Sequence, residues 1–193
     1  ENDPVTTEHP AGARDRLLSA ARAELADRGS ASVSMRAVAR RAGLSHAAPG
    51  HFFGDRAGLL TAVAADGFRS LTESLDEART GVPDDRALSA LGRAYVDFGL
   101  AHPALMDLMF RRDELDADDE ELREAQAAAI GRLRSVFADG ASDDARALVS
   151  WAVAHGLVML AREGVLGSAA GRTPGQSAAV AEELIAAHAS FVG

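Results

Sequence analysis

The chain has 193 residues, a formal net charge of −9 and no cysteine, and 47% of its residues are hydrophobic. The absence of cysteine excludes disulfides, thiolate metal sites and cysteine nucleophiles, while the hydrophobic fraction suits one small and one larger packed unit. No uncharged apolar run reaches the roughly 20 residues that span a bilayer. The first residues lack a positively charged segment followed by an apolar one, so we expect no secretory signal, no membrane partner and a cytoplasmic location.

The negative charge is unevenly distributed along the chain. Residues 1–70 hold nine arginines and eight acidic residues, which gives them a net charge of +1. Since the whole chain has a net charge of −9, residues 71–193 carry a net charge of −10. Every basic residue is an arginine, whose planar guanidinium suits bidentate contacts with phosphate. Acidic groups farther away than the Debye length of about 8 Å repel a phosphate backbone only weakly. The first 70 residues therefore remain compatible with a nucleic-acid partner.

Residues 33–56 have the pattern of two short helices joined by a tight turn. Ser34 can cap the first helix, and Gly43 supplies the positive φ that ends it. Ala39 is small enough to let the two helices approach closely, and Ser45 can cap the second. This pattern predicts a DNA-binding helix-turn-helix, although similar capped helices also occur in bundles that do not bind DNA.

The flanking sequence supports the DNA-binding interpretation. Residues 14–28 carry apolar side chains at helical spacing and end at Gly29, which suits a scaffold helix. Asp55 can cap a longer helix after the helix-turn-helix. We therefore predict a DNA-binding domain over residues 13–58, preceded by a disordered tail over residues 1–12.

Residues 13–70 resemble the N-terminal domain of TetR-family transcriptional regulators. The resemblance rests on the order and spacing of Ala39, Gly43, Leu44, Ser45, Phe53, Arg56 and Leu59. It implies that Phe53 anchors the recognition helix in the core of the domain and that Arg56 contacts a DNA phosphate.

The C-terminal part resembles one branch of the same family. That branch has a Trp-x-x-x-His-Gly signature, which here is formed by Trp151, His155 and Gly156, and residues 102–110 fit it as well. The resemblance implies an all-α protein of about nine helices, with a ligand-binding and dimerisation domain over residues 59–193. It also implies a transcriptional repressor that a ligand releases from DNA.

The predicted DNA contacts come from the helix-turn-helix and its flanks. They are Ser34, Met35, Arg36, Ser45, His46, Ala47, His51, Phe52 and Arg56. Four arginines are the clearest candidates for phosphate contacts, although a solvated face explains any single one of them equally well. They are Arg36, Arg40, Arg41 and Arg56.

The recognition helix departs from the family pattern. Gly50 and His51 stand where the family has tyrosine and a basic residue, so one typical phosphate contact is missing. We place Pro49 at about the fourth helical position, where it forfeits a hydrogen bond, and Gly50 adds about 1 kcal/mol of helix penalty. These residues predict a short, weakly stable helix. They leave open a second interpretation, a small-molecule-binding or scaffolding dimer whose head no longer binds DNA.

Beyond residue 70 the sequence reads as helices separated by short breaks at residues 80–83 and 102–103. Residues 113–121 contain seven acids in nine positions, which is compatible with a metal site or with a solvated helix start. Acidic residues favour a helix N-terminus and no histidine lies nearby, so we favour the helix start and predict no metal and no cofactor.

Residues 147–161 carry no charge, and their only polar side chains are Ser150 and His155. A helix that is apolar on every face must be buried all round, and this run is too short to cross a membrane. We therefore expect Leu148, Trp151, His155 and Met159 to face the interior of the chain. We expect the opposite side of this helix, together with the C-terminal helix over residues 174–191, to face a second subunit. The predicted homodimer interface comprises Val149, Val153, Gly156, Leu160, Val180, Leu184, His188 and Phe191. Such a dimer places two recognition helices about 34–36 Å apart, which suits a near-palindromic operator.

Aromatic and methionine side chains in the C-terminal domain form a candidate binding site for a small apolar or amphipathic effector. They are Phe68, Tyr95, Phe98, Met106, Met109, Phe110, Phe137, Trp151, His155 and Met159. Each of them alone is more simply explained as core. His155 can hydrogen-bond a ligand or a backbone carbonyl, and we favour the structural role.

No nucleophile, metal cluster or phosphate-binding loop accompanies the histidines, and residues 163–172 lack the phosphate-loop lysine, so we predict no enzyme activity.

Overall fold

The computed structural model describes residues 10–137 and 141–192, and within them all regular structure is helical. The α-helices are α1 (Pro10–Arg28), α2 (Met35–Ala42), α3 (Ala48–Phe53), α4 (Arg56–Arg79), α5 (Asp84–Ala101), α6 (Pro103–Met109), α7 (Glu120–Arg134), α8 (Ala141–Arg162), α9 (Val165–Ala169) and α10 (Ser177–Val192), with short 3₁₀ turns η1 (Ser30–Ser32) and η2 (Pro174–Gln176). The predicted all-α class is confirmed, with ten described α-helices where about nine were predicted. Residues 1–9 of the predicted tail lie outside the described residues, and residues 10–12 belong to α1.

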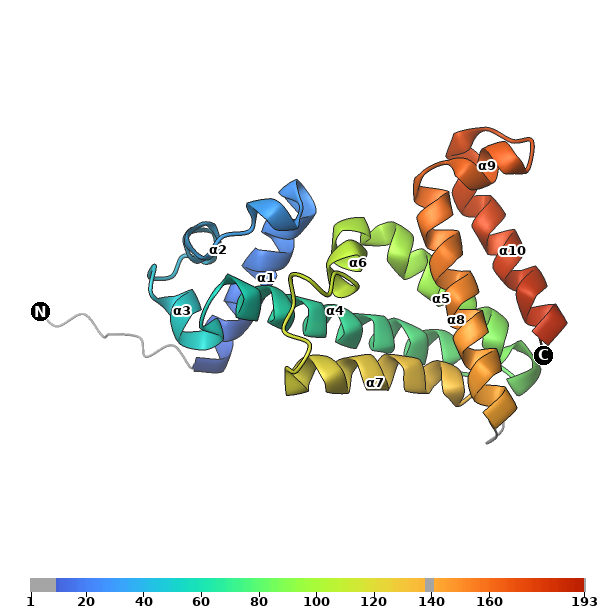
Figure 1. The fold of residues 1–193 in the computed structure, drawn as a ribbon, viewed down its shortest axis with the longest axis horizontal. Helices are drawn as coiled ribbons and strands as arrows, with labels where there is room; N and C mark the ends of the chain where they lie inside the picture. The colour runs from blue at the N-terminus through green and yellow to red at the C-terminus, as the bar shows by residue number, and fades with distance from the viewer. Residues whose placement is uncertain (1–9, 138–140, 193) are drawn as a thin grey trace, which may run out of the picture.

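The helices form a small head and a larger bundle (Figure 1). The head consists of α1, α2, α3 and the first turn of α4, and α4 continues from it along the bundle with α7 beside it. Helices α8 and α10 pack against each other at the end of the molecule opposite the head. The long helix α4 therefore connects any DNA-binding surface of the head to the bundle.

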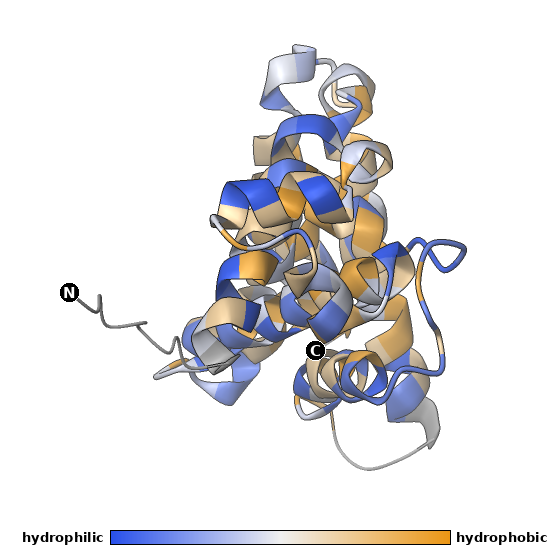
Figure 2. Ribbon diagram, turned by 90° about the vertical axis from the view of Figure 1, so that its left-hand side faces the viewer, coloured by the Kyte–Doolittle hydropathy of each residue, from blue (hydrophilic) through white to orange (hydrophobic). Residues whose placement is uncertain are grey.

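One apolar core runs through both parts of the molecule. Leu17 and Val38 of the head and Val96 and Val158 of the bundle are fully buried in the same cluster, to which α4 contributes Leu59. Hydrophilic and hydrophobic segments alternate along the helices, as Figure 2 shows. Because the core is continuous, the head is packed on the bundle and is not tethered to it by a free linker.

Ion pairs also join the head to the bundle. Arg22 of α1 donates to Asp66 of α4 at 2.7 Å, and Glu121 of α7 accepts from Arg14 at 3.0 Å and from Arg69 at 2.8 Å. These pairs are partly solvated, so each contributes little to stability, and their main effect is to fix orientation.

The last three acids of the run form the start of α7, as the favoured interpretation predicts, whereas the first four lie in the segment before the helix. The Asp119 carboxylate accepts from the Leu122 amide at 2.8 Å, and Glu120 and Glu121 occupy the first helical turn. The acids therefore stabilise the positive end of a helix.

Candidate DNA-binding surface and ligand cavity

The turn between α2 and α3 has the geometry that the sequence predicts. The Ser34 hydroxyl accepts from the Ala37 amide at 3.3 Å and caps α2. Gly43 ends that helix with φ 66° and ψ 33°, and the Leu44 amide donates to the Ala39 carbonyl at 3.0 Å. The helix-turn-helix is therefore closed by local hydrogen bonds at its first cap and its turn.

The start of α3 differs from the prediction. The helix begins at Ala48 with Ala47 as its N-cap, and no side chain caps it. Ser45 contributes its carbonyl, which accepts from the Ala48 amide at 3.1 Å, so the predicted Ser45 side-chain cap is wrong. Pro49 lies in the first turn, where a missing amide costs no intrahelical hydrogen bond, so the penalty assigned to Pro49 is also wrong. The recognition helix is nevertheless short, with six residues.

Most predicted DNA contacts are exposed on the head. The exposed ones are Ser34, Arg36, Ser45, His46, Ala47 and His51, and the half-buried ones are Met35, Phe52 and Arg56. Apart from His51 in the last turn of α3, the exposed polar groups cluster around the N-terminal ends of α2 and α3, where base and phosphate contacts of a helix-turn-helix are expected.

The candidate arginines fall into two groups. Arg36 and Arg40 are exposed on α2 and have no hydrogen-bond or ion-pair partner among the described residues. Arg41, in contrast, donates to Asp27 at 2.8 Å and to Glu24 at 2.9 Å, and the bonds to these carboxylates raise the pKa of Arg41. Two cations of α2 therefore remain available for phosphate, while the third is neutralised within the head.

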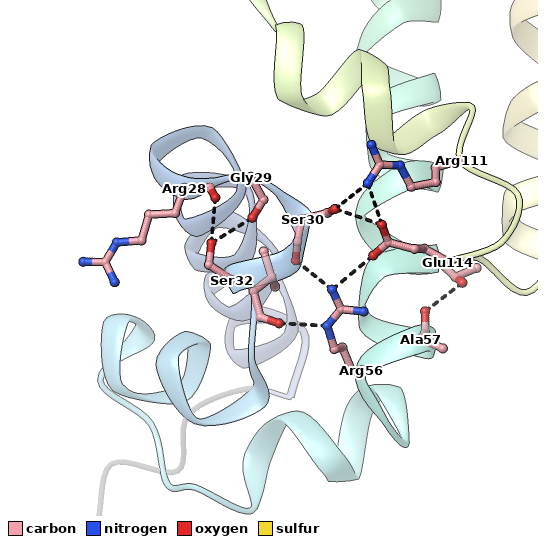
Figure 3. Close-up of polar contacts among 10 residues, drawn as sticks. Arg28, Gly29, Ser30, Ser32, Arg56, Ala57, Arg111 and Glu114 are labelled. Atoms are coloured by element: carbon pink, nitrogen blue, oxygen red, sulfur yellow. Dashed lines mark hydrogen bonds and ion pairs between the residues drawn. The ribbon is translucent and has the colours of Figure 1, made fainter.

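Arg56 is turned towards its own chain (Figure 3). Its Nε donates to the Val33 carbonyl at 3.0 Å, and its Nη2 donates to the Ser30 carbonyl at 2.7 Å and to Glu114 Oε2 at 3.1 Å. Only Nη1 has no described acceptor, so the phosphate contact that the resemblance implies stays a prediction.

Glu114 lies at the centre of this network and comes from the segment between α6 and α7. Its Oε1 accepts from the Ser30 hydroxyl and from Arg111 Nη1, each at 2.9 Å. The Arg111 bond is the main cause of a lowered pKa for Glu114, and the bonds from Ser30 and Arg56 add to it. The four side chains of Ser30, Arg56, Arg111 and Glu114, which we call the Glu114 network, join the head to the bundle (Figure 3).

The bundle contains an apolar cavity of about 420 Å³ with walls from α4, α5, α7, α8 and α10. This volume lies within the range of about 300–1,000 Å³ that small-molecule sites occupy. Of the predicted ligand-contacting residues, Phe68, Tyr95, Phe110 and Trp151 line this cavity. Met106, His155 and Met159 line a more open recess, which shares Phe110 with the cavity.

Three predicted ligand contacts lie elsewhere. Phe98 and Met109 are buried in the core and line neither space, and Phe137 lies against the Arg146 guanidinium, 5.1 Å from its ring centroid. The wall formed by α7, which includes Arg123, Gln126 and Ile130, was not predicted from the sequence. These three residues have helical spacing, but two of them are polar and small alanines stand between them. The pattern is therefore typical of a helix face that is exposed to solvent.

Tyr95, Trp151 and His155 form a hydrogen-bonded group beside the cavity. The Trp151 Nε1 group donates to the Tyr95 oxygen at 3.1 Å, which leaves the Tyr95 proton free for His155 Nδ1 at 3.0 Å. Burial raises the pKa of Tyr95 to about 12 and lowers the pKa of His155. Within the chain, His155 Nδ1 therefore has a side-chain partner in place of a backbone carbonyl, while contact of His155 with a ligand stays a prediction.

Helices α8 and α10 present an uncovered apolar face. The exposed fractions are 55% for Val149, 41% for Leu160, 43% for Leu184 and 88% for Phe191. Val153, Gly156 and His188 of the predicted interface are half-buried.

Two residues of this region are placed differently from the prediction. Val180 is only 5% exposed because its side chain packs in the core, so it does not belong to the uncovered face. Leu148 was expected to face the interior, but it is 45% exposed at the edge of the cavity.

The segment Asp143–Arg162 of α8 is long and apolar enough on average to cross a membrane, although its uncharged run is shorter. Only 33% of that segment is buried within the protomer. Length and composition do not separate a membrane span from a helix at a subunit interface.

Comparison with known proteins identifies the family. Residues 17–63 match the family described as bacterial regulatory proteins, tetR family, and residues 88–188 match the tetracyclin repressor-like C-terminal domain. The second match includes Trp151 and His155, while the Trp-His-Gly branch itself stays a prediction. None of the curated proteins matches the sequence significantly.

Solved structures agree with this assignment. A protein of unknown function from a Rhodococcus species is 30% identical, with a TM-score of 0.76 over 96% of this chain and 98% of that one. A TetR-like transcriptional regulator from Rhodococcus is 17% identical, with a TM-score of 0.62 over 93% and 94% of the two chains. The TetR-family regulator PfmR from Thermus thermophilus is 17% identical, with a TM-score of 0.62 over 92% and 97%. The chain belongs to the TetR family of DNA-binding transcriptional regulators.

Proposed function

We propose that this protein is a ligand-responsive repressor that binds a near-palindromic operator as a homodimer and is released by a small apolar or amphipathic effector. The observation that carries the proposal is the combination of an exposed helix-turn-helix with two unpartnered α2 arginines and an apolar cavity in the attached bundle. A ligand shifts DNA binding only by its difference in affinity for the DNA-competent and DNA-incompetent states, typically 1–3 kcal/mol.

The apolar face of α8 and α10 supports the homodimer. Two helices from each protomer would form a four-helix interface around a twofold axis, which would cover Leu160, Leu184 and Phe191. Bringing two heads together in this way lets one protein contact two half-sites in successive major grooves.

Selection of genomic DNA fragments by the purified protein at about 150 mM salt tests the proposed operator binding. We expect enrichment of a near-palindromic site whose affinity falls as the salt concentration rises. Failure to enrich any sequence would favour the second candidate, a small-molecule-binding or scaffolding dimer with a degenerate head. That candidate is supported by the six-residue length of α3 and by Gly50 in its middle.

Removing the charge of Arg36 or Arg40 is expected to weaken operator binding. Each Gln substitution should lower the slope of log affinity against log salt by about one, because one phosphate contact is lost. Filter binding or fluorescence anisotropy across a salt series measures this slope.

Arg93→Gln is the matched control, since Arg93 is an exposed arginine of α5 in the bundle. An equal loss of slope in Arg93→Gln would contradict the assignment of the phosphate contacts to α2.

A further inference from the structure

The polar groups that line the cavity differ in whether they already have partners. Tyr95 and Trp151 are hydrogen-bonded to each other, and His188 Nε2 lies 3.0 Å from the Ser150 hydroxyl. Arg123 has no hydrogen-bond or ion-pair partner among the described residues. It is exposed to solvent and is the one arginine, lysine or acidic residue in the described lining, so a single positive charge borders the cavity.

The positive charge lies at one end of the cavity. Glu121, near the start of α7, pairs with Arg69 at 2.8 Å, and Arg132, near its end, bonds Asp76 at 2.9 Å. Helix α7 therefore runs in the same direction as α4. Arg123 is two residues after Glu121, so it lies towards the end of the cavity at which α7 meets Arg69 of α4.

The opposite end of the cavity is mostly apolar, although the hydrogen-bonded pair of Ser150 and His188, from the neighbouring parts of α8 and α10, lies towards it. This end is lined by Leu75, next to Asp76 on α4, by Leu133, next to Arg132 on α7, and by Leu88 of α5. The cavity thus has one cationic end and one mostly apolar end, which matches a molecule with one anionic head and one hydrocarbon tail.

We propose that the effector is an amphipathic carboxylate, with its acid group on Arg123 and its apolar part among the leucines. This identification rests on the proposed function. A carboxylate can form an ion pair with two hydrogen bonds from the guanidinium, and a cationic amphiphile is repelled. A neutral alcohol can accept a hydrogen bond but forms no ion pair, so it binds more weakly.

Octanoate and octan-1-ol are suitable probes because they share the hydrocarbon tail and differ in the head group. Trp151 is the only tryptophan and lies in the cavity wall, so its fluorescence reports on occupancy without any DNA. We expect saturable octanoate binding that is about tenfold tighter than octanol binding. Arg123→Gln should abolish this preference, whereas Arg93→Gln should retain it.

A cavity-filling variant separates the cavity from the uncovered apolar face. Ala127 lies on an exposed side of α7 and lines the cavity, so Ala127→Phe is expected to fill it and prevent octanoate binding without unfolding the bundle. The inference would be overturned by any of three results. They are unchanged octanoate binding in Arg123→Gln or Ala127→Phe, equal affinity of the unmodified protein for octanol and octanoate, and no saturable binding of octanoate. Loss of operator binding alone would instead overturn the proposed function.

A separate observation concerns how the cavity communicates with the head. Phe110 lines both the cavity and the recess, and its ring centroid lies 5.6 Å from that of Phe68, 6.0 Å from Trp151 and 4.6 Å from His155. The next residue is Arg111, which belongs to the Glu114 network. The Asp116 amide also donates to the Thr61 hydroxyl of α4 at 2.9 Å. The segment between α6 and α7 is therefore attached at two places, through Glu114 and through Asp116.

We infer that Glu114 acts as a latch between the cavity and the head. It fixes the segment over residues 30–33 and the start of α4 through Ser30 and Arg56 while the cavity is empty. A ligand that displaces Phe110 moves Arg111, loosens the Glu114 network and frees the head to change its orientation. The two states differ in discrete hydrogen bonds, which is how packed proteins switch.

Amide hydrogen exchange tests the latch through a double-mutant cycle. Glu114→Gln is expected to speed exchange over residues 30–56 about tenfold relative to core amides of α5. Phe110→Ala alone should speed exchange over the same residues. In the Glu114→Gln background it should cause no further increase, because Phe110 acts through Glu114.

Glu121→Gln is the control, since Glu121 joins α7 to Arg14 and Arg69 outside the Glu114 network. The latch would be overturned by unchanged exchange in Glu114→Gln, by additive effects of the two substitutions, or by an equal effect of Glu121→Gln over residues 30–56.

Discussion

Leu184→Arg is expected to convert the protein into a monomer and to lower operator affinity by about 10²–10⁴. Leu184 is 43% exposed on the apolar face of α10, so an arginine there places two like charges near the twofold axis of the proposed dimer. The loss is large because a dimer binds its second half-site as an intramolecular event with a high effective concentration. Light scattering measures the mass, and anisotropy with the operator measures the affinity.

Ala179→Arg provides the matched control, because Ala179 is exposed on the same helix but away from Leu184 and Phe191. It introduces the same charge and is expected to leave the dimer and its operator affinity intact. A Leu184→Arg protein that remains dimeric would show that another surface makes the interface.

Gly58→Ala is expected to destabilise the head by about 2–3 kcal/mol and to abolish operator binding. A glycine in the first turn of a helix would ordinarily be improved by alanine. Here a Cβ at Gly58 would lie 2.1 Å from the Phe53 carbonyl oxygen, a backbone atom that moves only with the end of α3. The substitution also disturbs the cap of α4, where Asp55 accepts from the Gly58 amide at 2.9 Å.

Gly50→Ala is a control of opposite sign. A Cβ at Gly50 meets no atom within 4 Å and its φ is not positive, so alanine should stabilise α3 by up to about 1 kcal/mol. Urea unfolding monitored by circular dichroism compares the two variants. Similar small changes in both would contradict the assigned steric role of Gly58.

The ligand cavity marks the limit of prediction from sequence. Aromatic residues such as Phe68 and Trp151 could be assigned to it because large apolar side chains at helical spacing must face an interior. Phe98 has the same pattern but packs in the core, and the α7 wall with Arg123 has a pattern typical of a solvated face. Whether an apolar side chain meets another side chain or an empty space depends on how several helices pack, which no single helix encodes.

The sequence by itself determined the all-α class, the helix-turn-helix, the breaks between helices and several helix ends. Ser34, Gly43 and Asp55 act on amides, carbonyls and dihedral angles within a few residues of themselves, so their effects can be read along the chain. Only the tertiary structure decided the partners of the arginines. Arg36 and Arg41 look alike in sequence, yet one faces solvent and the other meets Asp27. Arg56 meets Glu114, 58 residues away, because charge pairing depends on distance in space.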